Sequence, residues 1–268
     1  MRADAGPCQA RIEVPATYAT LHLLRELIKR DFQARFTGSA LGVVWAVLQP
    51  LSLVALYWFV FTFMIPGGRA GGSGGEYIYF LISGLIPWLG INEGLTRSTT
   101  AIVENGTIVR RVPLRSELLV VVPNVSALIF ECIGMGIFLV AIVGRGMPVR
   151  GLWLLPVAIG LQLALQIGVG FFLAASYVFF RDLTQILGFV LSIVFYLSPI
   201  LYPVGGRFEA VFFWNPLTAL FGLFRSALLA SPLPDVASIV FLLIVVTMVL
   251  GAGLLFFRRT RPTLVDLI

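Results

Sequence analysis

The chain has 268 residues, of which 59% are hydrophobic and 12% are charged, and its formal net charge is +6. Soluble domains are closer to roughly 45–50% apolar and about 25% charged, so this composition excludes an ordinary soluble protein. Several apolar runs reach the ~20 residues that a helix needs to cross a bilayer core. The sequence therefore predicts an all-α integral membrane protein, whose basic charge serves lipid and topology rather than nucleic acid.

The chain begins with a polar stretch, 1–18, which we expect to be an irregular cytoplasmic tail. Residues 19–36 have helical periodicity, with an apolar face that is made by Leu21, Leu24, Ile28 and Phe32. A basic amphipathic helix beside a membrane span tends to lie in the plane of the interface. We predict that placement for 19–36. An ordinary helix that packs on a partner protein remains the alternative.

A single transmembrane domain, 37–257, follows, and its apolar runs predict six spans. They cover about 38–65, 77–95, 118–143, 152–180, 183–202 and 236–257. Near the end of the second span, Glu93 and Arg97 are one helical turn apart and are placed to form an ion pair. In the fourth span, Gln162 and Gln166 are also one turn apart.

The segment 205–234 is apolar in part but too short for an easy crossing, and Asn215-Pro216 interrupts it. Both ends of the chain are rich in arginine, and the tail 258–268 is basic, so both termini are predicted to be cytoplasmic. The number of crossings is then even, which six spans satisfy and seven do not. We therefore predict that 205–234 enters the membrane from the outer side and returns, as two short helices.

The longest polar interval between apolar runs is 96–117, and arginines cluster in it. Short loops of this kind stay in the cytoplasm, so this interval is predicted to be a loop that contacts a cytoplasmic partner. The single lysine, Lys29, follows Ile28, so no Gly-Lys-Ser/Thr sequence exists in the chain. A P-loop is thus absent, and any ATPase that drives this protein must be another polypeptide.

Six segments, in this order, resemble the transmembrane subunit of ABC type-2 polysaccharide exporters over roughly residues 19–257. They are RDFQARFTGSALGVVWAVLQP (30–50), ISGLIPW (82–88), ENGTIVRRVPLRSELL (104–119), FRDLTQIL (180–187), YLSPILYP (196–203) and NPLTALFGLFRSALL (215–229). The resemblance implies a homodimer of six-helix subunits with two nucleotide-binding ATPase subunits on the cytoplasmic face, where ATP and Mg²⁺ would bind. This chain itself is expected to hold no cofactor.

The resemblance also implies two working segments. Residues 104–115 would form a coupling helix in a groove of the ATPase, with contacts from Glu104, Asn105, Ile108, Arg110, Arg111 and Arg115. These charges could pair with an acidic partner surface; lipid contact and topology alone are the alternative. The segment after YLSPILYP would form the outer re-entrant gate, with Asn215, Pro216 and Arg225 as its candidate residues.

No catalytic constellation and no metal motif is present, and His22 is the one histidine. Glu131 is the one acid deep in a span, where it would serve either a channel or a hydrogen bond to a neighbouring helix. Aromatic rings can stack on the C–H faces of sugars, and the channel-lining candidates are Tyr57, Phe61, Phe195 and Tyr196. An interfacial aromatic belt or ordinary packing is the alternative for the aromatic residues.

Together, these features predict the permease half of an ATP-driven exporter of a lipid-linked polysaccharide in the bacterial inner membrane. Three alternatives remain: an ABC type-2 exporter of a small lipid or drug, a membrane enzyme that acts on polyprenyl-linked sugars, and a passive channel. The enzyme would need clustered acids or a metal motif at a membrane face, and the sequence shows neither. The passive channel would need no ATPase partner.

Overall fold

The computed structural model describes residues 16–36, 42, 44–60, 63, 74–107, 116–149, 151–203 and 212–267. Every regular element in this part of the chain is a helix, which confirms the all-α class. The helices are α1 (Ala16–Phe36), α2 (Val44–Phe59), α3 (Gly74–Glu104), α5 (Glu117–Gly144), η2 (Leu152–Leu154), α6 (Leu155–Phe179), α7 (Leu183–Leu197), α9 (Pro216–Leu229) and α10 (Val236–Leu267).

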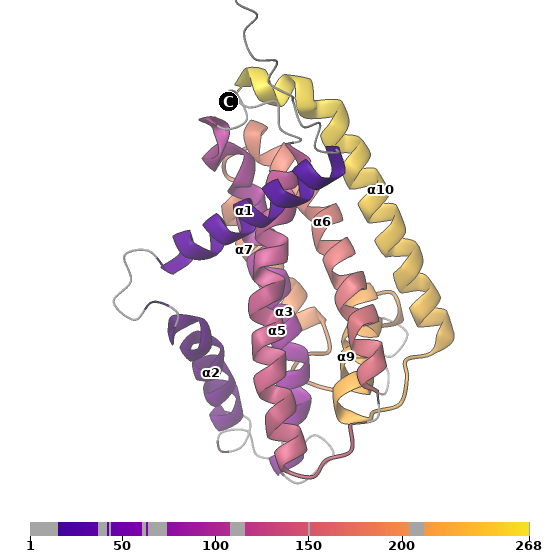
Figure 1. Cartoon of the computed structure of the whole chain (residues 1–268). Coiled ribbons are helices and arrows are strands. Elements are labelled where there is room, and N and C mark those ends of the chain that lie inside the picture. The colour runs from indigo at the N-terminus through magenta and orange to yellow at the C-terminus, as the bar shows by residue number, and fades with distance from the viewer. Residues whose placement is uncertain are drawn as a thin grey trace, which may run out of the picture.

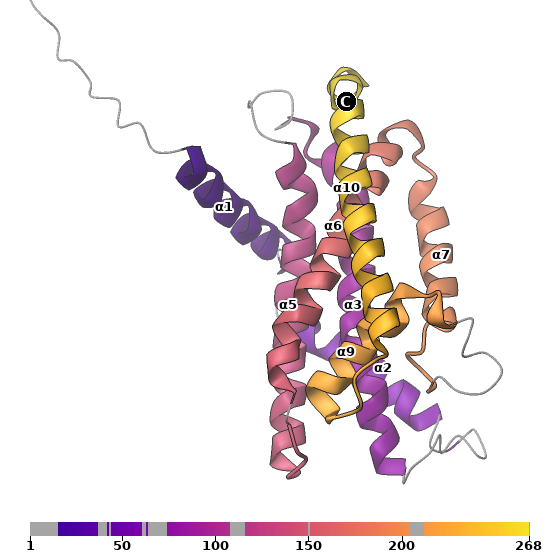
Figure 2. The ribbon, with the colours of Figure 1, turned by 90° about the vertical axis from the view of Figure 1, so that its right-hand side faces the viewer.

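The long helices α3, α5, α6 and α10 run side by side along one axis, and α1 crosses them obliquely (Figure 1). At the upper end in this view α3 ends, α5 begins, and the chain terminates. We call this the Glu104 end. Helix α9 lies toward the opposite end, which we call the Arg225 end. The quarter turn in Figure 2 shows α1 projecting away from the bundle and α7 standing at its other side.

Four helices are long and apolar enough to cross a bilayer. They cover Tyr77–Glu104, Glu117–Gly144, Leu152–Phe179 and Val236–Leu264. Helix α7 has 15 residues, or about 22 Å at ~1.5 Å per residue, against a core of about 30 Å. Helix α2 has 16 residues, and parts of its predicted span, 38–65, lie outside the described residues. The count of six spans therefore stays a prediction.

The polar interval 96–117 is not a loop throughout, because its first nine residues continue α3 to Glu104. The Ser98 and Thr99 hydroxyls donate to the Leu95 carbonyl oxygen, at 3.1 and 2.7 Å, and both side chains are buried. A Ser or Thr inside a helix can satisfy its hydroxyl by donating to the carbonyl three or four residues earlier, so its polarity does not require the helix to end. Polarity had suggested a loop here, and the packing of these side chains makes it helix. Residues 108–115 lie outside the described residues.

Two further boundaries differ from the sequence expectation. Helix α1 begins at Ala16, three residues before the predicted start at 19. Helix α10 continues through the basic tail to Leu267, with Pro262 inside it, whereas the last span was expected to end at 257. Because both extensions are polar or basic, hydrophobicity alone did not reveal them.

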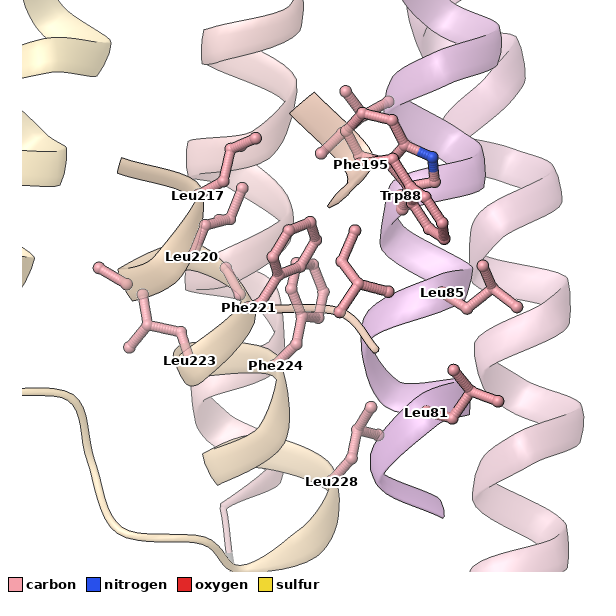
Figure 3. Close-up of a cluster of buried hydrophobic side chains, with 14 of the residues drawn as sticks. Leu81, Leu85, Trp88, Phe195, Leu217, Leu220, Phe221, Leu223, Phe224 and Leu228 are labelled. Carbon is pink, nitrogen blue, oxygen red and sulfur yellow. The ribbon is translucent and has the colours of Figure 1, made fainter. Parts of the chain in front are cut away.

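The largest group of buried apolar side chains lies where α9 meets α3. Figure 3 shows Phe221, Phe224 and Leu228 of α9 directed toward α3, whose Leu81 and Leu85 side chains are drawn on the side of that helix away from α9. Trp88 of α3 also packs on Phe195 of α7, with ring centroids 5.6 Å apart. In a bilayer, close packing rather than exclusion of water holds helices together. This cluster therefore fixes the short helix α9 against the long helix α3.

Candidate functional site

Residues 197–203, LSPILYP, follow α7 and form what we call the exit loop. A helix leaves its last carbonyl groups without intrahelical partners. The helix cannot continue here, because Pro199 favours an extended conformation at the residue before it, and Ser198 has φ −99° and ψ 147°. The carbonyl groups of the exit loop therefore need donors from elsewhere in the fold.

Side chains of α3 and α9 supply those donors. The Asn215 amide donates to Leu197 O at 3.2 Å and to Ser198 Oγ at 3.3 Å. The Arg225 guanidinium donates to Pro199 O at 2.6 Å and to Ile200 O at 3.3 Å. The Tyr77 hydroxyl donates to Leu201 O at 2.8 Å. Four carbonyls in five consecutive residues are thus bound to side chains of other elements.

Arg225 is the centre of this arrangement. Its side chain is buried, with 8% of the residue exposed, and its guanidinium carbon lies 3.7 Å from the centroid of the Phe80 ring. Gly84 leaves room for it, because a Cβ there would lie 3.0 Å from Arg225 Nη2. A charged side chain within a membrane protein commonly pairs with backbone carbonyls, and Arg225 does so. It joins α9, α3 and the exit loop.

Asn215 and Pro216 begin α9, as the sequence break suggested. The Asn215 side chain is the N-cap and accepts a hydrogen bond from the Leu217 backbone N–H at 3.0 Å. Pro216 occupies the first turn, where its missing N–H costs nothing. The three gate residues expected from the sequence therefore all lie on α9 or at its start, and Asn215 and Arg225 both contact the exit loop. The preceding residues, 204–211, lie outside the described part of the chain.

A second polar group lies inside the bundle, between α3, α5 and α6. We call it the polar ladder, and its residues are Gly90, Gly94, Ser98, Asn124, Glu131, Gln162, Gln166 and Gly170. The Glu131 carboxylate accepts a hydrogen bond from the Gln162 amide. A Cβ at Gly90 would overlap that carboxylate, and one at Gly94 would lie 2.7 Å from Asn124 Oδ1. This geometry favours the interhelical hydrogen bond for Glu131 over a place on an open channel.

The aromatic channel candidates separate into different environments. Phe195 is buried with 6% exposed, because it packs on Trp88, so it does not face the outside of this protomer. Its neighbour Tyr196 is 60% exposed and therefore does. Tyr57 lies within α2, but its side chain is outside the described residues, as is all of Phe61.

The predicted coupling segment is described only at its start. Glu104 is exposed at the end of α3, and the Asn105 amide donates to Ala101 O at 2.9 Å. Asn105 thereby ends the helix, while Glu104 stays accessible to a partner. The remaining candidates lie outside the described residues and are Ile108, Arg110, Arg111 and Arg115.

Ion pairs join the elements of the Glu104 end. Arg97 lies 3.7 Å from Glu93, which confirms the pair expected from their spacing. Arg97 also bonds Asp31 of α1, a contact that the sequence did not indicate. Arg258 Nε of α10 lies 3.4 Å from a Glu117 oxygen of α5.

The sequence reasoning missed Tyr77, Asp31 and the small residues of the polar ladder, although it had singled out Glu131, Gln162 and Gln166. Tyr77 and Asp31 give no local signal, because their partners are distant in sequence. The ladder did give one: Gly90, Gly94 and Ser98 are small residues at four-residue spacing, which is typical of close helix contacts in membranes. Within the described residues, no group of three His, Cys, Asp or Glu side chains could hold a metal ion.

Comparison with known proteins relates the sequence to polysaccharide transport permeases. The chain is 26% identical to the O-antigen export system permease protein RfbA of Myxococcus xanthus, over 89% of this chain and 92% of that protein. It is 28% identical to the RfbA permease of Klebsiella pneumoniae, over 74% and 76% of the two chains.

A third relative is the polysialic acid transport protein KpsM of Escherichia coli, which is 22% identical over 89% of this chain and 93% of that protein. The family model described as ABC-2 type transporter matches residues 22–229, which include α2 to α9 and most of α1. The chain therefore belongs to the ABC-2 type transporter family, as a multi-pass membrane permease.

Proposed function

We propose that this chain is the permease subunit of an ATP-driven exporter that carries a lipid-linked polysaccharide to the outer face of the bacterial inner membrane. Two copies would form the path, and two copies of a separate ATPase subunit would bind ATP and Mg²⁺. The observation that carries the proposal is the match to O-antigen and polysialic acid transport proteins over most of both chains. The chain's own sequence, which contains no P-loop, supports a separate ATPase.

In this proposal the Glu104 end faces the cytoplasm. The arginines of 104–115 and those near the end of α10 support that orientation. The coupling segment would contact the ATPase, with Glu104 exposed at its start. Charges on the two surfaces would then set the register of the contact.

Helix α3 is the element through which ATP-driven movement would reach the other side. It is one continuous helix from Gly74 to Glu104, so Tyr77 and Glu104 are about 40 Å apart at ~1.5 Å per residue. One of its ends carries the coupling segment, and the other contacts the exit loop through Tyr77 and Arg225 through Phe80. A displacement of α3 would therefore disturb the contacts of the exit loop.

We assign the exit loop and α9 to the outer gate, held closed in this conformation. Opening would require Asn215 and Arg225 to release the exit-loop carbonyls. The exposed Tyr196 ring lies in the last turn of α7 and is placed to stack on sugar rings as the glycan passes. Such stacking does not depend on the order of the sugars, so it would allow a polysaccharide to slide through the path.

The direct test is to isolate the affinity-tagged chain from its own cells in mild detergent and identify co-purifying proteins. We expect an ATPase with a P-loop, and we expect cells without this chain to lose a surface polysaccharide and accumulate it inside. The Arg110→Glu, Arg111→Glu double variant should insert normally but lose the ATPase. Purified chain that moves glycan without a second protein would refute the proposal, as would an unchanged cell surface.

A further inference from the structure

Helix α1 has two clearly different faces. Its exposed side is polar and mostly basic, and consists of His22, Arg25, Glu26, Lys29, Arg30 and Gln33. Within residues 22–33, whose side chains the structure describes, the less exposed side is apolar except at one position. There, Asp31 lies between Ile28 and Phe32 with its side chain 20% exposed. An acid on the apolar side of an amphipathic helix is costly unless it is paired, so its partner is informative.

The partner of Asp31 is Arg97 of α3. Around this pair, Phe32 stacks on Phe130 of α5, with ring centroids 4.8 Å apart and planes 6° apart. Leu27 packs one turn earlier against the buried cluster at the Glu104 end. The apolar contacts thus hold α1 on α5, while the ion pair fastens it to α3. Helix α1 is therefore docked on two helices by contacts of different chemistry.

The positions of Arg97 and Asp31 in their helices show which segments the ion pair connects. Arg97 lies seven residues, or about two turns, before Glu104, where α3 meets the coupling segment. Asp31 lies five residues before the end of α1 at Phe36, and only seven residues separate Phe36 from the start of α2 at Val44. The pair therefore links the helix that carries the coupling segment to the helix that leads into α2.

We propose that Arg97 is a positioning residue that transmits displacement of the coupling segment from α3 to α1, and through α1 to α2. The inference rests on the proposed function. Without the pair, α1 keeps its apolar contacts on α5 but no longer follows α3. A displacement of α3 would then reach the export path directly but would no longer move α1 and α2.

Glu93 provides a matched control. It lies on α3 itself and approaches Arg97 at 3.7 Å, so its contact with the guanidinium joins two positions of one helix. Arg97 is the charged group that faces Asp31, and Glu93 and Asp31 are the acids that contact Arg97. Glu93→Gln changes the charge as much as Asp31→Asn does. Asp31→Asn removes the ion pair between α1 and α3, whereas Glu93→Gln leaves that pair in place.

The docking can be measured without any substrate. In the full chain with Cys8 and Cys132 changed to Ser, spin labels are placed at Glu26→Cys on α1 and at Thr107→Cys beyond α3, two exposed positions. Pulsed electron resonance in lipid nanodiscs then gives the distance distribution between α1 and the coupling end. We expect one narrow distribution in this background and in Glu93→Gln, and a broader one in Asp31→Asn and in Arg97→Gln.

The swap Asp31→Arg, Arg97→Asp tests the pair itself. It should restore the narrow distribution, and in the complex with the co-purified ATPase it should return export to within about twofold of the parent. Each single neutral variant should lower export by about tenfold, with less effect on ATP hydrolysis. The swap should recover this loss, because the effects of two residues in direct contact are non-additive. Loss of coupling with ATP hydrolysis retained is a readout that mere unfolding would not give.

Unchanged distances in both single variants would overturn the inference. A swap that fails to restore export, or variants that widen the distance yet export normally, would do the same. Since the distance measurement uses neither glycan nor ATPase, it decides the docking of α1 even if the protein exports nothing. An absence of export in every variant, with the distances as expected, would count against the proposed function instead.

Discussion

The two ends of the bundle are held together by different chemistry. At the Arg225 end, the contacts are donors to backbone carbonyls, made by side chains such as Tyr77 and Arg225, which are buried. At the Glu104 end, the polar contacts between helices are ion pairs with partial exposure, beside apolar packing. The side chain of Arg97 is 31% exposed, and that of Arg258 is 61% exposed.

This difference indicates at which end the contacts between helices separate more easily. A carbonyl that loses its donor inside a bilayer has no water to replace it, so releasing the exit loop is costly. An exposed ion pair such as Arg258–Glu117 is individually weak and is screened by salt, so it can be exchanged for contacts with a partner protein. The arrangement suits input at the Glu104 end and a firmly closed outer gate at the Arg225 end.

The sharpest way to break the comparison is to remove Arg225. Arg225→Met keeps most of the side-chain volume but leaves the Pro199 and Ile200 carbonyls without a donor. We expect the free energy of unfolding to fall by about 2–3 kcal/mol, because a hydrogen bond to a charged group contributes ~1.5–3 kcal/mol. Thermal unfolding of the purified chain in detergent measures it.

Arg225→Lys is the control for this prediction. It keeps the charge but cannot reproduce the planar guanidinium, which stacks on Phe80 while it donates to two carbonyls. The loss of stability in Arg225→Lys should therefore be smaller than the loss in Arg225→Met. An Arg225→Met protein as stable as the parent would show that the exit loop is not held by this side chain.

A second prediction concerns the polar ladder between the two ends. Gly90→Ala places a Cβ against the Glu131 carboxylate and should destabilise the chain by about 1–3 kcal/mol through overpacking. The same change should cost much less in a Glu131→Ala background, where the obstructing group is gone. Gly160→Ala is the matched control in α6, because a Cβ there meets nothing within 4 Å. Equal effects of Gly90→Ala in both backgrounds would contradict this packing.

A third, smaller effect is expected at Asn215. Asn215→Ala removes the N-cap of α9 and the contact with Leu197 O, and a lost cap costs about 1 kcal/mol. Asn215→Asp keeps the cap acceptor but not the amide donor. The difference between Asn215→Asp and the parent therefore isolates the contact with the exit loop, and the difference between the two variants isolates the cap. If both variants unfold together with the parent, neither role of Asn215 matters to stability.

The smallest effect is expected at the exposed ion pair of the Glu104 end. Arg258→Glu reverses the charge 3.4 Å from Glu117, yet its stability should change by no more than about 1 kcal/mol, because exposed pairs contribute ~0–1 kcal/mol. The change should also shrink as salt is raised. A loss as large as that of Arg225→Met would erase the proposed difference between the two ends.

Local patterns predicted part of this architecture. Apolar runs located the four long spans, and the Asn215-Pro216 break located the start of α9. The spacing of Glu93 and Arg97 predicted their pair. These features depend on neighbours in sequence or on hydrophobicity over one helix, which a single sequence contains.

What the sequence did not predict depends on contacts between distant segments. The Tyr77 hydroxyl bonds a residue 124 positions away, and Arg97 bonds one 66 positions away. Nothing in the sequence indicated that Phe195, one of the channel candidates, packs on Trp88 of α3. Periodicity shows that a helix has faces, but not which face meets which helix.

The central claim is that the exit loop must leave α9 during export, and a reversible lock tests it most directly. Ser198 and Asn215 lie close enough for their side chains to hydrogen bond, at 3.3 Å. With Cys8 and Cys132 changed to Ser, a Ser198→Cys, Asn215→Cys pair can be oxidised in the assembled complex while export is followed. We predict that export stops when the disulfide forms and returns on reduction, while each single cysteine variant exports in both conditions. Full export with the disulfide intact would contradict the account.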